Sequence, residues 1–146
     1  MSKKNRPKPD WMFHQSAVIP YQIQNGVLEI LLITSRKRSR WIIPKGIIEE
    51  DLDASSSAIK EAWEEAGITG RIVFDKPIGT YTYSKWGGTC HVEVFLFEVR
   101  TSFHDWPEAL MRDREWVTID EAIKRIDESA LKNMLASIPD YLTNGL

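Results

Sequence analysis

Runs of apolar residues between polar turns divide the chain into predicted strands. The runs cover residues 16–21, 27–34, 41–43, 70–74, 78–85, 90–99 and 115–118. Such runs, bounded by polar and glycine-containing turns, are typical of β-strands. The Asn25-Gly26 pair between the first two runs is a strong hairpin signal. The Trp86-Gly87-Gly88 segment predicts a second turn.

Helical spacing of apolar residues appears in three further segments. Residues 54–66 are flanked by Asp53, which suits a helix N-cap, and by Gly67, which suits a helix end. Residues 120–126 and 129–142 also have helical patterns, and Pro139 is expected to break or end the second of these helices. Strands and helices in this mixed order, with several hairpins, predict an α/β sandwich around a mixed β-sheet.

The composition is that of an ordinary globular protein. A chain of 146 residues suits one domain, expected over residues 13–146 after a flexible basic tail over residues 1–12. The net charge of -2 gives no general attraction to nucleic acid or membranes. Cys90 is the only cysteine, which excludes an internal disulfide and a cysteine-built metal site. No apolar run reaches the ~18 residues of a membrane span, so a soluble, cytoplasmic protein is expected.

Three glutamates gather on one side of the predicted helix over residues 54–66. Glu61, Glu64 and Glu65 fall within a narrow arc, which by itself is typical of a solvated helix face. However, Glu61 and Glu65 repel each other at i,i+4 spacing, and all three carboxylates lie in the half where the helix dipole disfavours negative charge. Hard cations such as Mg²⁺ bind carboxylate oxygens. The preceding loop, Pro44-Lys45-Gly46, could add backbone carbonyls.

The spacing of these residues resembles a known motif. The Nudix box reads G-x5-E-x7-R-E-U-x-E-E-x-G-U, where U is aliphatic, and the chain closely resembles it from Gly46 to Ile68. The matching residues are Gly46, Lys60-Glu61-Ala62, Glu64-Glu65 and Gly67-Ile68. The resemblance implies a Nudix-type α/β/α sandwich around a mixed sheet.

The likeness continues toward the C-terminus and also has two departures. Residues 105–108 and 112–117 are similar to diphosphoinositol polyphosphate phosphohydrolases, a Nudix subgroup that also cleaves diadenosine polyphosphates. The family's first glutamate is replaced by Leu52 and its arginine by Lys60. Those two family residues pair to brace the loop against the helix. In this chain the partner of Lys60 could instead be Glu49, Asp51 or Asp53.

The resemblance implies metal-dependent hydrolysis of a diphosphate linkage in a small polyphosphorylated molecule. Mg²⁺ or Mn²⁺ would be the cofactor, and Glu61, Glu64 and Glu65 would be the catalytic and metal-binding residues. A backbone carbonyl of Lys45 or Gly46 would complete the metal site. One of the three glutamates would serve as general base, and the sequence does not indicate which. The expected substrates are diadenosine or diphosphoinositol polyphosphates.

A basic cluster precedes the predicted metal site. Single cations in such a turn are usually solvated, but arginine suits phosphate oxygens and the group as a whole predicts an anion clamp. The expected substrate-binding residues are Ser35, Arg36, Arg38, Arg40, Lys45 and Gly46. Lower weight goes to Tyr83 and Trp86, which could stack on an adenine but more often pack in a core, and to Glu93 and Glu108 as extra acidic groups.

Two other functions stay open at this point. Leu52 and Lys60 would suit a catalytically weak Nudix-fold sensor that binds a nucleotide or metabolite without turnover. Cleavage of capped RNA 5′ ends would use the same chemistry, although no aromatic-rich RNA surface motif is present and no nucleic-acid or membrane partner is expected. The oligomeric state is not indicated by the sequence.

Overall fold

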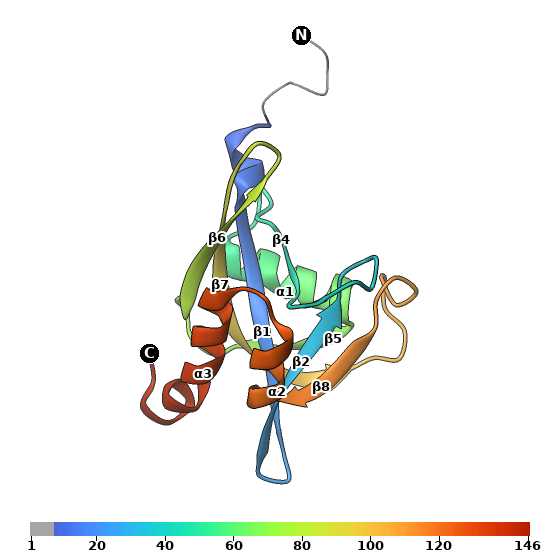
Figure 1. Ribbon diagram of the computed structural model, residues 1–146, viewed down its shortest axis with the longest axis vertical. Helices are drawn as coiled ribbons and strands as arrows, with labels where there is room; N and C mark the ends of the chain where they lie inside the picture. The colour runs from blue at the N-terminus through green and yellow to red at the C-terminus, as the bar shows by residue number, and fades with distance from the viewer. Residues whose placement is uncertain (1–7) are drawn as a thin grey trace.

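Eight strands pair into one mixed β-sheet in the computed structural model, which describes residues 8–146 (Figure 1). The strands are β1 (His14–Gln24), β2 (Val27–Thr34), β3 (Trp41–Ile42), β4 (Lys45–Ile47), β5 (Ile68–Ile72), β6 (Gly79–Lys85), β7 (Gly88–Ser102) and β8 (Arg114–Thr118). The main path runs β3-β2-β1-β7-β5, while β4 also pairs with β1, β6 with β7 and β8 with β2. The β1–β7 pair is parallel and the other pairs are antiparallel.

Helices cover both faces of this sheet, which confirms the predicted α/β/α sandwich (Figure 1). The helices are η2 (Asp10–Phe13, a 3₁₀ turn), α1 (Ala54–Ala66), α2 (Ile119–Arg125) and α3 (Ser129–Asn144). Residues 1–7 of the predicted basic tail lie outside the described residues. Within residues 8–146, no helix is long and apolar enough to cross a lipid bilayer.

Alternation along the strands divides the buried side chains into two clusters. On β1, Ala17 and Ile19 face α2 and α3, while Val18 faces α1, because successive side chains of a strand point to opposite faces. The cluster beneath α1 includes Ala58, Ala62 and Ala66. These small residues let the helix backbone lie close to the sheet.

The predicted limits of α1 are confirmed. The Asp53 side chain accepts a hydrogen bond from the Ser56 N–H, and Gly67 ends the helix in the left-handed region at φ 66°. The hairpin predicted at Asn25-Gly26 is also present, since β1 and β2 pair in antiparallel register on either side of it. Both signals are local, so the surrounding sequence sufficed to predict them.

Two local predictions are wrong. Pro139 was expected to break or end its helix, but α3 continues through it. Pro139 is exposed, while Leu135 and Ile138 before it are fully buried, so packing keeps the helix in place despite the missing N–H. Pro44-Lys45-Gly46 was expected to be a loop, but Lys45 and Gly46 belong to β4, because the backbone of Lys45–Ile47 pairs with β1.

The segment between β7 and β8 covers the C-terminal end of α1. The last carbonyls of a helix lack partners within it and must be satisfied from outside. Here Glu64 O accepts from Glu108 N (3.1 Å), Glu65 O from Trp106 Nε1 (3.0 Å) and Ala66 O from Arg114 Nη1 (2.7 Å). The positive charge of Arg114 also suits the negative end of the helix dipole. The segment that resembles the phosphohydrolase subgroup therefore satisfies the C-terminal carbonyls of α1.

Replacing Gly67 tests this packing. In Gly67→Ala the added Cβ would lie 2.7 Å from the Trp106 ring, and the alanine would have to adopt the left-handed backbone conformation of Gly67. Gly26 has a similar φ of 78°, but a Cβ added there would meet open space. We expect Gly26→Ala to lower the free energy of unfolding by about 1–2 kcal/mol and Gly67→Ala to lower it by roughly 1–3 kcal/mol more. Urea unfolding measures both. Equal losses would contradict a tight contact between Gly67 and Trp106.

Candidate active site

One cavity of about 410 Å³ lies where α1, β4 and the tip of the β6–β7 hairpin meet. Its walls combine acidic side chains from the helix with basic side chains from the strands and turns. It is lined by Gln15, Ser35, Arg36, Ile42, Lys45, Gly46, Ile47, Glu61, Glu65, Lys85, Trp86 and Arg112. A cavity with both charge types can hold cations and anions together.

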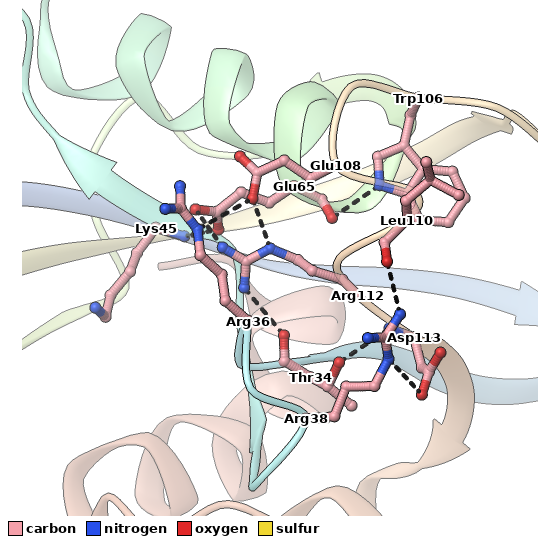
Figure 2. Close-up of polar contacts among 10 residues, drawn as sticks. All are labelled: Thr34, Arg36, Arg38, Lys45, Glu65, Trp106, Glu108, Leu110, Arg112 and Asp113. Carbon is pink, nitrogen blue, oxygen red and sulfur yellow. Dashed lines mark hydrogen bonds and ion pairs between the residues drawn. The ribbon is translucent and has the colours of Figure 1, made fainter.

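The cavity gathers most, but not all, of the site residues predicted from sequence. Six of them line it: Ser35, Arg36, Lys45, Gly46, Glu61 and Glu65. Arg38 does not, because its guanidinium is held by the Leu110 carbonyl (2.9 Å) and by Asp113 (3.4 Å) (Figure 2). Arg40 lines a separate, smaller cavity of about 60 Å³. Glu64 lies beside the site on α1, with its Oε1 3.9 Å from Lys60 Nζ.

Glu65 is the buried carboxylate of the site, at 7% exposure. Its Oε1 accepts from the Lys45 backbone N–H (3.0 Å) and its Oε2 from Arg112 Nη2 (3.3 Å). Burial raises the pKa of Glu65, while Arg112 and the Lys45 N–H oppose that shift. A solvated helix face is therefore excluded for this residue. Conversely, the apolar side chain of Ile59 on the same helix is 39% exposed.

Arg112 connects three segments of the chain at the floor of the cavity. Figure 2 shows its guanidinium between Glu65, Glu108 and Thr34. Nε donates to Glu108 Oε1 (2.9 Å) and Nη1 to the Thr34 carbonyl (3.0 Å). The sequence reading did not assign Arg112 to the site. Its i,i+4 spacing from Glu108 was the available signal, but such pairs are common on surfaces.

Glu108 extends this ion-pair network toward the cavity mouth. Its Oε1 lies 3.7 Å from Arg36 Nε as well as 2.9 Å from Arg112 Nε. Arg36 is the exposed end of the network, since its side chain keeps 66% of its surface accessible, compared with 5% for Arg112. A ligand that enters the cavity therefore meets Arg36 first and can reach it without disrupting the buried pairs.

Glu61 lies directly against Gly46. A Cβ at Gly46 would come within 2.3 Å of the Glu61 carboxylate, so only glycine leaves room for that side chain. The pKa of Glu61 is raised to about 8, first by burial and then by the charges of Glu65 and Glu64. Neighbouring negative charges disfavour the ionised form of Glu61, and the glycine beside it has no side chain to block access. Both features suit a bound cation.

The donor chemistry fits a hard divalent cation, because the acidic groups beside Gly46 are all oxygen donors. Across residues 8–146, however, no three His, Cys, Asp or Glu side chains lie close enough together to hold an ion. Glu65 is directed to Arg112 and to the Lys45 N–H, so its oxygens already have partners. Binding a cation through several glutamates therefore requires their side chains to rearrange.

The brace between loop and helix is present despite the substitutions in the motif. Lys60 Nζ lies 2.6 Å from Glu49 Oε1, so Glu49 is the partner among the three carboxylates considered. The Glu49 N–H also donates to Ser57 Oγ (3.0 Å). Two contacts thus tie the loop to α1 without a glutamate at Leu52.

The residues given lower weight lie in different places. Trp86 lines the cavity, and Tyr83 lies behind it in contact with Lys45. Glu93 lines another cavity, together with His14 and His91. The imidazole rings of these two histidines stack at a centroid distance of 6.1 Å across β1 and β7.

Comparison with known proteins points to one family. The NUDIX domain model matches residues 12–138. Nudix hydrolase 4 of Arabidopsis thaliana is 33% identical over 102 residues, which are 68% of this chain and 48% of the relative. Diphosphoinositol polyphosphate phosphohydrolase 3-alpha of Mus musculus is 32% identical over 99 residues, covering 66% of this chain and 58% of the relative. The chain thus spans about half to three fifths of the length of these curated relatives.

The fold also resembles solved structures over nearly its full length. The crystal structure of the C. elegans Ap4A hydrolase aligns with a TM-score of 0.73 at 25% identity, covering 88% of this chain and 97% of that chain. Curated relatives include proteins named chloroplastic and mitochondrial. The cytoplasmic location expected from the sequence therefore stays a prediction.

Replacing Arg112 tests its role in holding the site together. Arg112→Met would leave the buried Glu65 carboxylate, the half-buried Glu108 carboxylate and the Thr34 carbonyl without this partner. We expect the free energy of unfolding to fall by about 3–5 kcal/mol, the cost of breaking a buried ion pair. Arg71→Met is the matched control, because the 3.2 Å Arg71–Glu98 pair is exposed and its loss should cost about 0–1 kcal/mol. Urea unfolding that gave the same small loss for both variants would contradict the assignment.

Proposed function

The chain belongs to the NUDIX family, and from that premise we propose that its domain, residues 13–146, hydrolyses a phosphoanhydride linkage in a small polyphosphorylated substrate. The observation that carries the proposal is the shared cavity. It brings Glu61 and Glu65 of α1 within the same walls as the cationic side chains of Arg36, Lys45 and Lys85. Acidic groups suit a metal cofactor, and the cations suit the phosphates of its substrate.

Mg²⁺ or Mn²⁺ is the proposed cofactor. Glu61, Glu64 and Glu65 would hold it, together with a backbone carbonyl of Lys45 or Gly46. The contact between Glu61 and Gly46 supports this assignment, because it places the Glu61 carboxylate next to the Gly46 backbone, with no side chain between them. When bound, a divalent cation neutralises phosphate oxygens and lowers the pKa of a water molecule.

The residues of the chain supply binding, orientation and proton transfer. Arg36 and Lys45 would bind phosphate oxygens, and Ser35 would add a hydroxyl at the same wall. One of the α1 glutamates would accept the proton of the attacking water. The Arg112 network would keep the helix and the β4 backbone in fixed relative positions during that step.

Diadenosine and diphosphoinositol polyphosphates are the proposed substrate classes. The names of the mouse relative and of the C. elegans structure support them. Several phosphates would also suit the cationic side chains of Arg36, Lys45 and Lys85 in the cavity. The brace between Lys60 and Glu49 weighs against a sensor without turnover, because the substitutions that suggested a sensor have not removed the contact between loop and helix.

Replacing Glu65 tests the catalytic assignment. Glu65→Gln keeps the shape and the acceptor for the Lys45 N–H but removes the negative charge. We expect kcat/KM for Mg²⁺-dependent hydrolysis of diadenosine tetraphosphate to fall at least ~100-fold. Glu93→Gln is the control, since Glu93 lies outside the cavity and its loss should leave the rate within about twofold. A folded Glu65→Gln variant with near-normal turnover would contradict a catalytic role for Glu65.

A pair of arginine variants tests whether the basic side of the cavity binds phosphate. Arg36 lines the cavity and Arg38 does not, although both lie in the same exposed turn. We expect Arg36→Ala to raise KM for diadenosine tetraphosphate about tenfold, and to raise it less for a substrate with two phosphates. Arg38→Ala should change KM much less. Equal effects of the two variants in steady-state kinetics would remove Arg36 from the substrate site.

A further inference from the structure

A chain of side-chain hydrogen bonds runs along one wall of the cavity and ends at Lys45. Lys45 Nζ donates to Tyr83 Oη (3.2 Å), and Tyr83 Oη donates to Gln15 Oε1 (2.7 Å). The Gln15 amide nitrogen in turn faces Cys90 Sγ at 3.8 Å. The four residues come from β4, β6, β1 and β7, so the sheet itself sets their spacing.

The donors and acceptors of this chain fix its direction. A tyrosine hydroxyl has one proton, and here that proton goes to Gln15. The Tyr83 oxygen therefore faces Lys45 as an acceptor. An ammonium group has three N–H donors, so Lys45 keeps two for a ligand while the third is held by Tyr83.

Lys45 shares its cavity with three other cationic side chains, those of Arg36, Lys85 and Arg112. Within residues 8–146, neither lysine side chain forms an ion pair with a carboxylate. Like charges repel, which disfavours a fixed position for the Lys45 ammonium, and its hydrogen bond to Tyr83 Oη opposes displacement.

Tyr83 lies outside the cavity of about 410 Å³, which is called the phosphate cavity from here on. It lines the separate cavity of about 60 Å³, whereas Lys45 lines both cavities. The ammonium also lies 4.7 Å from the centre of the Tyr83 ring, so ring and hydroxyl both contact it. Base stacking and simple core packing were the roles considered for Tyr83 from the sequence. The hydrogen-bond chain indicates a different one.

We propose that Tyr83 is a positioning residue that holds the Lys45 ammonium at the phosphate cavity, with Gln15 orienting the Tyr83 hydroxyl. The proposal rests on the proposed function only in that it takes the cavity to bind phosphate. It requires neither a bound metal nor turnover. Tyr83 would therefore affect phosphate affinity through Lys45.

A double-mutant cycle with inorganic tripolyphosphate tests the proposal. Isothermal titration calorimetry without divalent metal gives Kd for the wild type, Tyr83→Phe, Lys45→Met and the double variant. Tyr83→Phe keeps the ring and removes the hydroxyl. We expect it to raise Kd about five- to tenfold, and Lys45→Met to raise it more than tenfold. In the Lys45→Met background, Tyr83→Phe should change Kd less than about twofold, since the group it positions is absent.

Tyr21→Phe is the matched control, because Tyr21 also uses its hydroxyl in a side-chain hydrogen bond, to Glu98, outside the cavity. It should leave Kd within about twofold. The proposal is overturned by additive effects of the two substitutions, by an unchanged Kd in Tyr83→Phe, or by tripolyphosphate binding that does not need Lys45. Hydrolysis of diadenosine tetraphosphate, measured separately, distinguishes the two proposals. Turnover with additive Kd changes removes only the role of Tyr83, and a non-additive cycle without turnover removes only the hydrolase function.

Discussion

Burial of the Glu65 carboxylate is the constraint on which the rest of the site depends. A buried carboxylate is strongly unfavourable unless hydrogen bonds and an opposite charge compensate it. Here the Lys45 N–H and Arg112 provide both. Arg112 in turn requires Glu108 and the Thr34 carbonyl, so helix, β4, β2 and the segment before β8 must all be in place at once. The site therefore forms only with the complete fold.

The same helix carries the acidic groups and the packing that positions them. Its alanines lie on the sheet, and its last carbonyls are satisfied by Trp106, Glu108 and Arg114. Residues that resemble a phosphohydrolase motif thus have an identifiable structural task at the end of α1. The glutamates can then remain close together despite their repulsion, because neither end of the helix is free to move away.

Local signals predicted the fold well, and tertiary contacts account for what they missed. Asp53 and Gly67 fixed the limits of α1 because capping depends on adjacent residues. β4 was missed because its three residues become a strand only by pairing with β1. Arg112 was missed as a member of the site, and the contact between Tyr83 and Lys45 was missed, for a similar reason. Their partners are 47 and 38 positions away in sequence, and nothing near either residue indicates that contact.

The central claim is that the α1 glutamates beside Gly46 form a cation site within the phosphate cavity. Titration with Mn²⁺, followed by the electron paramagnetic resonance signal of the free ion, measures that site without any substrate. The account predicts saturable binding by the wild type, at least ~10-fold weaker binding by Glu61→Gln, and unchanged binding by Glu93→Gln. Equal Mn²⁺ affinity in all three proteins would contradict it.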